Sequence, residues 1–481
     1  MNKALSDINK DILKYTPSKV IGMLMNMAMV PIYTNLLLPE QYGLYNISIG
    51  ILSLIAIIFS DWVGMAALRF LKEHFKTDNV KEFFSSILFL ILSNLLVMYV
   101  IAFFLFNYLK SYFKVPEENL FLVLVLIIPI AFRALMFQIL RAQIKPFVYT
   151  VLSIFNQFTT IGLGIYFIKY FNLNSTGILW GMLVSITLVD VIMLVFCKMF
   201  LSSSIKKIST KSLGGFYKYG VPIAASSLGM WIITQSNKFV IQYFKGSEYN
   251  GYIGVGYNVT FSILFPLFAV ITLAGIPRII NRYEEGKDVS PLVSKLSGYF
   301  FVAFTPAVFL MCYFPQQLVL LLSNEKYISA AGLIPFLALS AFVYGMTEYT
   351  VIQYHLAKKT YLDMIIKISS NLAGIILLIL LVKFLEEKDI LWAVGVSALV
   401  SQLIYFGLTL IIRIRGIRDI VWVPPYRTLA KVITAILASY IVLFFSSEFV
   451  HSLSHTVIIQ SILFVCMYAC CNFVFNRVIA K

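Results

Sequence analysis

The chain has 481 residues, of which 60% are hydrophobic and 12% are charged, and its mean hydropathy is +0.88. A soluble protein of this size could not bury so much apolar surface and keep a polar exterior. The formal charge of +16 is better explained by membrane topology than by nucleic-acid binding, because cytoplasmic loops of membrane proteins collect Lys and Arg. Composition therefore indicates one polytopic membrane domain with no nucleic-acid partner.

Apolar runs of about 20 residues predict membrane-spanning helices, because backbone polar groups in hydrocarbon must be hydrogen-bonded within their own segment. The predicted fold class is therefore an all-α polytopic membrane protein with about fourteen such helices. The run at 328–356 is long enough to be tilted or broken. The fourteen runs cover residues 17–38, 44–70, 84–109, 118–140, 147–169, 176–198, 218–243, 252–276, 291–314, 328–356, 361–384, 390–412, 429–447 and 456–476.

The distribution of basic residues predicts the orientation of these helices. With a cytoplasmic N-terminus, 27 of the 38 Lys and Arg residues fall in cytoplasmic segments and 7 in external ones. This bias predicts cytoplasmic N- and C-termini and an even number of helices. Four basic residues remain inside the predicted helices: Arg133, Lys238, Lys295 and Lys367.

The segments between the helices carry no sign of a catalytic or cofactor site. The external loops are short, and the sequence has neither a Walker A loop nor a GxGxxG motif after a strand, so we expect no direct use of ATP. None of the five cysteines has a His or Cys partner at zinc spacing. We therefore expect no cofactor, no metal site and no catalytic residue.

A short motif recurs at the start of two helices. "PEQYGLY" (39–45) and "SEYNGYI" (247–253) share Glu-x-x-Gly at an offset of 208 residues. We interpret this as two parallel six-helix repeats around a central cavity, 1–204 and 205–414, with an additional helix pair in 415–481. Gly43 is expected to let the chain turn tightly. A chance match between two tight turns is the alternative.

Basic residues inside the predicted spans are candidates for a binding site. Each ionisable side chain there costs about 2.5–3.5 kcal/mol on insertion scales, so it should face a cavity or a partner. Arg133 follows Pro129 and lies far from both helix ends. Lys238, beside Gln235 and Asn237 in "TQSNKFVIQYF", either faces a cavity or snorkels to the outer end. Lys367 either lines the cavity or pairs with Asp363 at i,i+4.

Acidic residues in the spans are candidates for ion coupling. Asp61 and Arg69 share a broad face of the second helix, where they form either part of a site or a structural ion pair. Asp190 in the sixth helix is a candidate partner for Arg133 or Lys238. Glu348 lies close to the same face of the tenth helix as Tyr344 and His355. A carboxyl group in a dry site can change its protonation state near neutral pH, so Glu348 could carry a proton.

Together these residues predict an anion-attracting lumen and hinged helices. Arg133, Lys238 and Lys367, with Arg69 and Arg278 below them, would attract anions in a low dielectric, and phosphate is a natural partner. Mid-helix prolines mark bends or hinges, and hinged helices in two repeats predict alternating access. The prolines are Pro31, Pro129, Pro222, Pro266, Pro306 and Pro335.

Three segments resemble Wzx-type polysaccharide flippases, which belong to the multidrug/oligosaccharidyl-lipid/polysaccharide exporter superfamily. "MVPIYTNLLLPEQYGLYNIS" (29–48) resembles their first hairpin, and "FSDWVGMAALRFLKE" (59–73) resembles their second helix. "NKFVIQYFKGSEYNGYIGVGY" (237–257) resembles the start of their second half. Many relatives carry an acid–base pair where this chain has Asn237 and Lys238, which leaves Lys238 exposed to a ligand.

The resemblance implies a flippase for undecaprenyl-pyrophosphate-linked oligosaccharide in a bacterial cytoplasmic membrane, driven by an ion or proton gradient. Such a flippase would serve surface glycan synthesis, such as O-antigen of lipopolysaccharide or capsule, in contact with membrane lipids and the polymerase and chain-length machinery. Arg133, Lys238 and Lys367 would contact pyrophosphate or acidic sugars, and Glu348 or Asp61 would couple transport to the ion. Aromatic residues that could stack on sugars are Trp180, Tyr257 and Tyr344.

Two alternatives remain at this point. A cation-coupled multidrug exporter of the same superfamily would favour a cavity richer in acids than in bases. A lipid-linked glycan polymerase or ligase would carry a large external loop with catalytic Arg or His residues. The short external loops and the excess of basic residues in the spans favour the flippase over both.

Overall fold

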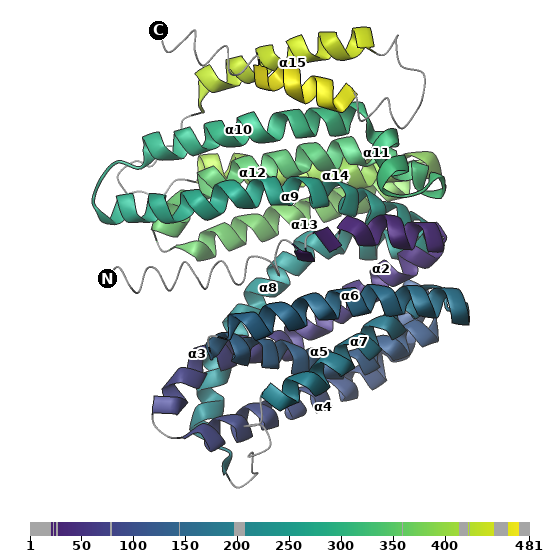
Figure 1. The fold of residues 1–481 in the computed structure, drawn as a ribbon, viewed down its shortest axis with the longest axis vertical. Helices are drawn as coiled ribbons and strands as arrows, with labels where there is room; N and C mark the ends of the chain where they lie inside the picture. The colour runs from purple at the N-terminus through teal and green to yellow at the C-terminus, as the bar shows by residue number, and fades with distance from the viewer. Residues whose placement is uncertain are drawn as a thin grey trace. The chain divides into compact units, whose positions relative to one another are not determined.

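The computed structural model describes most of the chain and divides it into two units, Met1–Gly251 and Tyr252–Lys481. The described residues are 21–22, 24–25, 27–76, 79–143, 145–196, 207–357, 359–412, 422, 424–446 and 460–470. Within these ranges the chain forms helices and short connections without a strand. The predicted all-α class is therefore confirmed, and Figure 1 shows the helices of each unit.

In the described part of unit 1, the first helical segment ends at residue 36. Its further elements are α2 (Pro39–Ala56), η1 (Ile57–Asp61), α3 (Trp62–Lys76), α4 (Val80–Phe113), α5 (Glu117–Ala142), α6 (Pro146–Phe171), α7 (Ser175–Phe196), α8 (Thr210–Lys245) and the first turn of α9 (Ser247–Glu284). Because α8 packs on α2, α3 and α4, it belongs to unit 1, and the boundary between the units lies after it. The boundary after residue 204 was predicted from the sequence repeat, and it stays a prediction.

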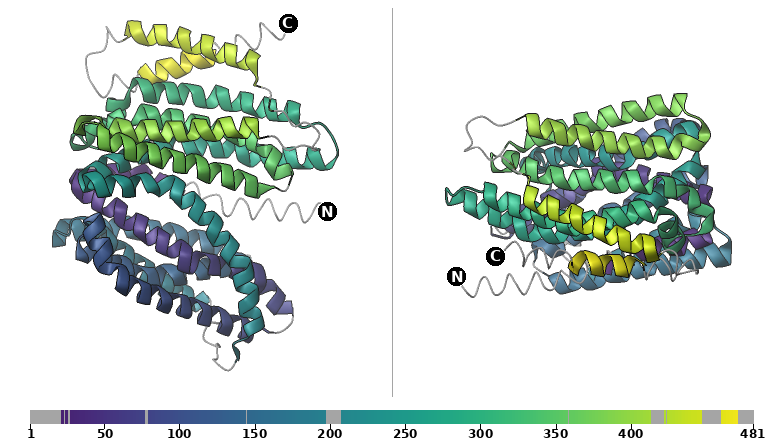
Figure 2. Two further views of the ribbon diagram at one scale, coloured as in Figure 1. Left: turned by 180° about the vertical axis from the view of Figure 1, so that it is seen from behind. Right: turned by 90° about the horizontal axis from the view of Figure 1, so that it is seen from above.

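Unit 2 holds the rest of α9 and the helices that follow it. These are α10 (Ser290–Tyr313), α11 (Pro315–Leu322), η4 (Glu325–Gly332), α12 (Ile334–Leu356), α13 (Thr360–Phe384), η5 (Glu387–Asp389), α14 (Ile390–Ile411) and α15 (Tyr426–Ser446). A helix at Gln460–Cys470 follows. It lies beside α15 in both Figure 1 and Figure 2, and Tyr468 packs with Val432 and Ala435 of α15.

Each of the fourteen predicted segments coincides with a helix in the described part of the chain. By length and composition, eight helices there are able to cross a membrane, and a ninth is added if the bent pair η4–α12 is one span. That pair bends by 51°, as expected for a broken segment at 328–356. Pro335 was expected in mid-helix, but it stands in the first turn of α12, where a missing N–H costs nothing.

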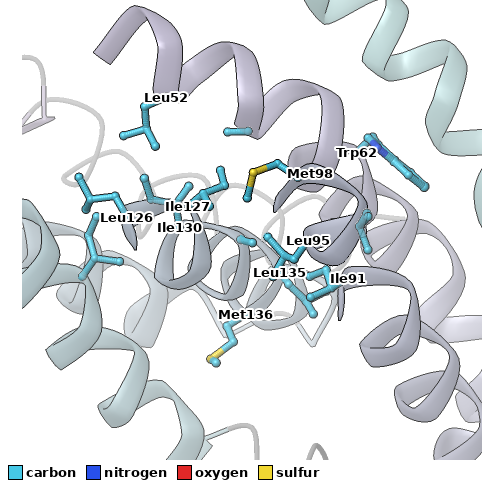
Figure 3. Close-up of a cluster of buried hydrophobic side chains, with 14 of the residues drawn as sticks. Leu52, Trp62, Ile91, Leu95, Met98, Leu126, Ile127, Ile130, Leu135 and Met136 are labelled. Atoms are coloured by element: carbon cyan, nitrogen blue, oxygen red, sulfur yellow. The ribbon is translucent and has the colours of Figure 1, made fainter. Parts of the chain in front are cut away.

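The core of unit 1 joins its helices through aliphatic side chains. Leu52 of α2, Ile91 of α4 and Leu126 of α5 belong to one buried cluster, and Figure 3 shows this cluster with its neighbours. Each of these three side chains is at most 4% exposed. In lipid, such close packing replaces the hydrophobic effect as the main force between helices.

The two units repeat one packing pattern. In unit 1, α7 packs along both α5 and α6, and in unit 2, α14 packs along both α12 and α13. These are the fourth to sixth predicted helices of each repeat. The same helix order with the same neighbours supports the interpretation of the chain as two pseudo-repeats.

The recurring Glu-x-x-Gly motifs meet each other in unit 1, but they are not turns. Gly43 lies in the first turns of α2, and its φ is not positive, so the expectation that it turns the chain was wrong. A Cβ on Gly43 would lie 1.7 Å from the Ser247 oxygen, and one on Gly251 would lie 2.0 Å from the Pro39 oxygen. Both glycines are therefore required by the close approach of two helix starts.

Candidate substrate and ion sites

Arg133 lies on α5 and is held by a polar network from α6 and α7. Its Nη1 donates to Asn156 Oδ1 at 2.8 Å, and Asn156 Nδ2 donates to Ser185 Oγ at 3.0 Å. The Ser185 and Thr159 hydroxyls share a further hydrogen bond of 2.5 Å. Asn156 and Ser185 are buried, whereas Arg133 is half-buried. The guanidinium group is thus fixed from one side, in a span where an unpaired charge is costly.

Two carboxylates share the charge of Arg133. Asp61 and Asp190 both interact electrostatically with its guanidinium group, and the partnership between Asp190 and Arg133 stays a prediction. Asp190 is 8% exposed, and its Oδ1 has no hydrogen-bond partner. One cation between two acids leaves the group with an excess negative charge whenever both acids are ionised.

Asp61 ends a π-helical turn between α2 and α3. The turn, η1, interrupts the regular hydrogen bonding of the helix, and Asn94 Nδ2 from α4 donates to the Phe59 oxygen at 3.1 Å. Such π-turns occur frequently at functional sites. Asp61 itself is exposed within the span Pro39–Leu71. A carboxylate at this depth must face water or a polar group, because contact with lipid is too costly.

Lys238 on α8 is a second cation of unit 1. It is half-buried and has no hydrogen-bond or ion-pair partner among the described residues. Gln235, one turn earlier on the helix, has a buried Oε1 atom without a partner in the described part of the chain, and Asn237 is half-buried. An ammonium group and a free amide oxygen on adjacent turns can receive a polar ligand with acidic and hydroxyl groups.

Arg69 and Arg278 lie on exposed surfaces of α3 and α9. Arg69 forms an i,i+4 ion pair with Glu73 at 3.4 Å, and this replaces the ion pair with Asp61 that the sequence left open. An exposed ion pair of this kind contributes little to stability. The expected role of Arg69 and Arg278 below the site stays a prediction.

Several ionisable residues of unit 2 gather where α12, α13 and α14 meet. Lys367 Nζ lies 3.9 Å from Asp363 Oδ2 and over the rings of Tyr344 and Tyr405, 5.5 and 5.3 Å from their centroids. Tyr405 Oη donates to Asp363 Oδ1. The contact between Lys367 and Asp363 is the i,i+4 pair that the sequence left open, so a substrate contact by Lys367 stays a prediction.

Glu348 and His355 lie at the edge of the same group. Glu348 interacts electrostatically with Tyr344, its neighbour at i−4, and His355 Nε2 lies 3.6 Å from Asp363 Oδ2. Tyr344 and Glu348 thus lie near each other on α12, as the sequence predicts. Among the described residues of this unit, the group holds two carboxylates and one lysine, the same balance as Asp61, Asp190 and Arg133 in unit 1.

Several residues that complete these groups carried no signal in the sequence. Asn156, Ser185 and Tyr405 are each one of several polar residues in apolar helices, and nothing in their spacing identifies their partners. The sequence repeat does not reveal them either, because Asn371 follows Asn156 by 215 residues, whereas the recurring motif has an offset of 208. Asn156 pairs with Ser185 on the next helix, and Asn371, 215 residues later, accepts a hydrogen bond from Ser401 at 3.1 Å.

Comparisons with known proteins agree with this architecture. Residues 8–282 match the family described as "Polysaccharide biosynthesis protein". An uncharacterized membrane protein of Methanocaldococcus jannaschii is 23% identical over 374 residues, 70% of each chain. The structure of lipid II flippase MurJ in an inward closed conformation superposes with a TM-score of 0.71 at 14% identity, over 98% of this chain and 99% of that one.

A second solved structure has the same fold. An inward-facing multidrug resistance MATE family transporter of the MOP superfamily superposes with a TM-score of 0.64 at 15% identity, over 83% of this chain and 97% of that one. At such low identity, both superpositions establish a shared fold and leave the transported substrate open.

Proposed function

The chain belongs to the polysaccharide biosynthesis protein family, and we propose that it is a flippase for undecaprenyl-pyrophosphate-linked oligosaccharide repeat units. The family resemblance seen in the first hairpin is thereby confirmed. The glycan would cross the bacterial cytoplasmic membrane through the protein by alternating access, while the lipid tail stays in the bilayer. The product would serve surface polysaccharide synthesis, such as O-antigen of lipopolysaccharide or capsule.

The observation that carries this proposal is the pair of cations in the spans of unit 1. Arg133 uses Nη1 for Asn156, and Lys238 has no partner among the described residues. A guanidinium group can bind a phosphate through two parallel hydrogen bonds, and an ammonium group adds a point charge. Both cations are therefore assigned to the pyrophosphate or to acidic sugars, with Gln235 and Asn237 as hydrogen-bonding neighbours.

Ion or proton coupling is assigned to the acids of both units. In this proposal, Asp61 and Asp190 compete with the substrate phosphate for Arg133. The phosphate would therefore bind Arg133 more tightly when these carboxylates are protonated. Glu348 is the corresponding acid of unit 2. Substitution of Glu348 by Gln is expected to weaken the dependence of transport on the proton gradient, whereas an unchanged pH dependence would remove Glu348 as the proton carrier.

Deletion of the gene in its host, followed by analysis of lipid-linked sugars and surface glycan, tests the proposal. A flippase predicts loss of surface glycan with complete repeat units trapped on the cytoplasmic side. Single repeat units that reach the outside but do not lengthen would instead identify a polymerase. An unchanged surface glycan would contradict the proposal and favour a multidrug exporter, which the MATE-like fold would equally accommodate.

A further inference from the structure

Asn156 connects Arg133 to the rest of unit 1, and its amide group has only one orientation that satisfies both neighbours. Its Oδ1 accepts from Arg133 Nη1 at 2.8 Å, and its Nδ2 donates to Ser185 Oγ at 3.0 Å. A guanidinium group only donates, so the amide cannot be reversed without losing the bond to Arg133. Asn156 is 7% exposed and Ser185 is fully buried, so water does not replace either bond.

The bond uses a small part of the donor capacity of Arg133. A guanidinium group has five N–H donors, and within the described part of the chain only Nη1 has a hydrogen-bond partner. Asp61 and Asp190 act on it through their charge. One nitrogen is thus anchored, and the other N–H groups stay available in fixed geometry.

The second repeat contains the same pair of polar residues without the arginine. Asn371 on α13 is also 7% exposed, and its Oδ1 accepts from Ser401 on α14. The residue that follows Arg133 by the same 215 positions is Glu348. Asn371 Nδ2 donates to the Lys367 oxygen of its own helix at 2.7 Å. An Asn–Ser pair therefore joins two helices in both repeats. Of these two described pairs, only the one in unit 1 also orients a cation.

We infer that Asn156 is a positioning residue, which holds the Arg133 guanidinium so that its free N–H groups meet the phosphate of the substrate. This inference rests on the proposed function. A preorganised guanidinium group loses little freedom when it binds a phosphate, and that raises its affinity. Ser185 and Thr159 in turn fix the Asn156 amide, so the network extends from α7 to the anion.

The substitutions N156A and N156D separate positioning from a structural role. N156A removes the anchor and is expected to weaken binding of inorganic pyrophosphate to the purified full-length protein about tenfold. N156D keeps an acceptor oxygen for Arg133 but adds a charge that neutralises the guanidinium group. Its pyrophosphate affinity is expected to fall by roughly a hundredfold, because the added carboxylate competes for the guanidinium group and repels the anion. A purely structural Asn156 predicts a change in melting temperature and none in affinity.

N371D is the matched control, because it places the same charge in the equivalent Asn–Ser pair. It is expected to leave pyrophosphate affinity unchanged. Wild-type affinity in N156D, an equal loss in N371D, or no pyrophosphate binding by the wild-type protein would each overturn the inference. A separate experiment asks whether the wild-type gene restores surface glycan in the deletion strain. If it does not, the proposed function is wrong, whereas the pyrophosphate-binding data still decide the role of Asn156.

Discussion

The uncompensated ammonium group of Lys238 makes a prediction that distinguishes function from structure. A charged group without a partner in a membrane span destabilises the folded protein, and Lys238 has no partner among the described residues. Substitution of Lys238 by Met should therefore keep or raise the melting temperature of the purified protein. At the same time, glycan export should fall at least about tenfold, because one charged hydrogen bond to the substrate phosphate is lost.

The substitution K238R is the control for this prediction, since it keeps the charge in a bulkier side chain. It should retain more export than K238M at similar protein levels. A K238M protein that melts earlier and exports glycan normally would show that Lys238 has a structural role and no contact with the substrate.

The sequence was informative about these cations for a simple physical reason. A basic residue inside an apolar run is expensive, so Arg133 and Lys238 stand out without any structure. Asn156 and Ser185 do not stand out, because amide and hydroxyl side chains are tolerated in spans and often bond to their own helix. Their role depends on which residue faces them across α5, α6 and α7, and single-sequence patterns do not contain that information.

The pairing of Lys367 with Asp363 predicts that helix α13 depends on both charges. The two side chains are 19% and 14% exposed and lie 3.9 Å apart, so removal of one leaves the other poorly compensated. K367M should lower the free energy of unfolding by about 1–3 kcal/mol. The double substitution D363N/K367M should recover part of this loss, because the amide oxygen introduced by D363N can still accept the hydrogen bond that Tyr405 gives to Asp363.

Thermal unfolding of the two single variants and the double variant in one detergent measures this coupling. Losses that simply add in the double variant would contradict the pairing. If K367M instead keeps full stability and loses export, Lys367 belongs with the substrate-contacting cations.

The contact between the starts of α2 and α9 makes a prediction about single methyl groups. A Cβ at Gly43 would lie 1.7 Å from the backbone oxygen of Ser247, and backbone atoms in two helices cannot move apart without separating the helices. G43A should therefore lower the melting temperature, with a cost of about 1–3 kcal/mol, as for other overpacked sites.

Gly162 on α6 is the matched control, because a Cβ there would meet nothing within 4 Å in the described part of the chain. Alanine favours a helix over glycine by about 0.5–1 kcal/mol, so G162A should stabilise the protein slightly. Equal melting temperatures for G43A and G162A would show that the two helix starts do not pack as closely as described.

Helix positions could be predicted well from the sequence, whereas the purpose of particular glycines and prolines could not. Long apolar runs identify helices because hydrocarbon permits few other conformations. Gly43 and Pro335 were both misinterpreted. For Gly43 the reason is that a glycine in a turn and a glycine at a helix crossing have the same local sequence. Only the partner segment at Ser247–Gly251 tells the two cases apart, and it lies about 200 residues away.

Across the whole chain, one scaffold carries opposite charges in its two repeats. Arg133 and Glu348 are 215 residues apart, as are Asn156 and Asn371, and the helices that bear them have the same neighbours. The repeated scaffold keeps the Asn–Ser pair between two helices, while the residue on the third helix changes from a base to an acid. In the proposed transporter, the base at this position would contact the anionic substrate, and the acid at the matched position would bind the coupling cation or proton.

The orientation of the whole molecule makes the last prediction. The excess of basic residues in alternate loops predicts that the N-terminus and the turn after α9 lie in the cytoplasm and that the start of α9 lies outside. Glu248 and Glu285 lie at the two ends of α9 and are both exposed. In a cysteine-free background, E248C should react with a membrane-impermeant maleimide on intact cells. E285C should react only after the membrane is opened, and labelling in the reverse order would overturn the topology and require Lys238 to approach the substrate from the cytoplasmic side.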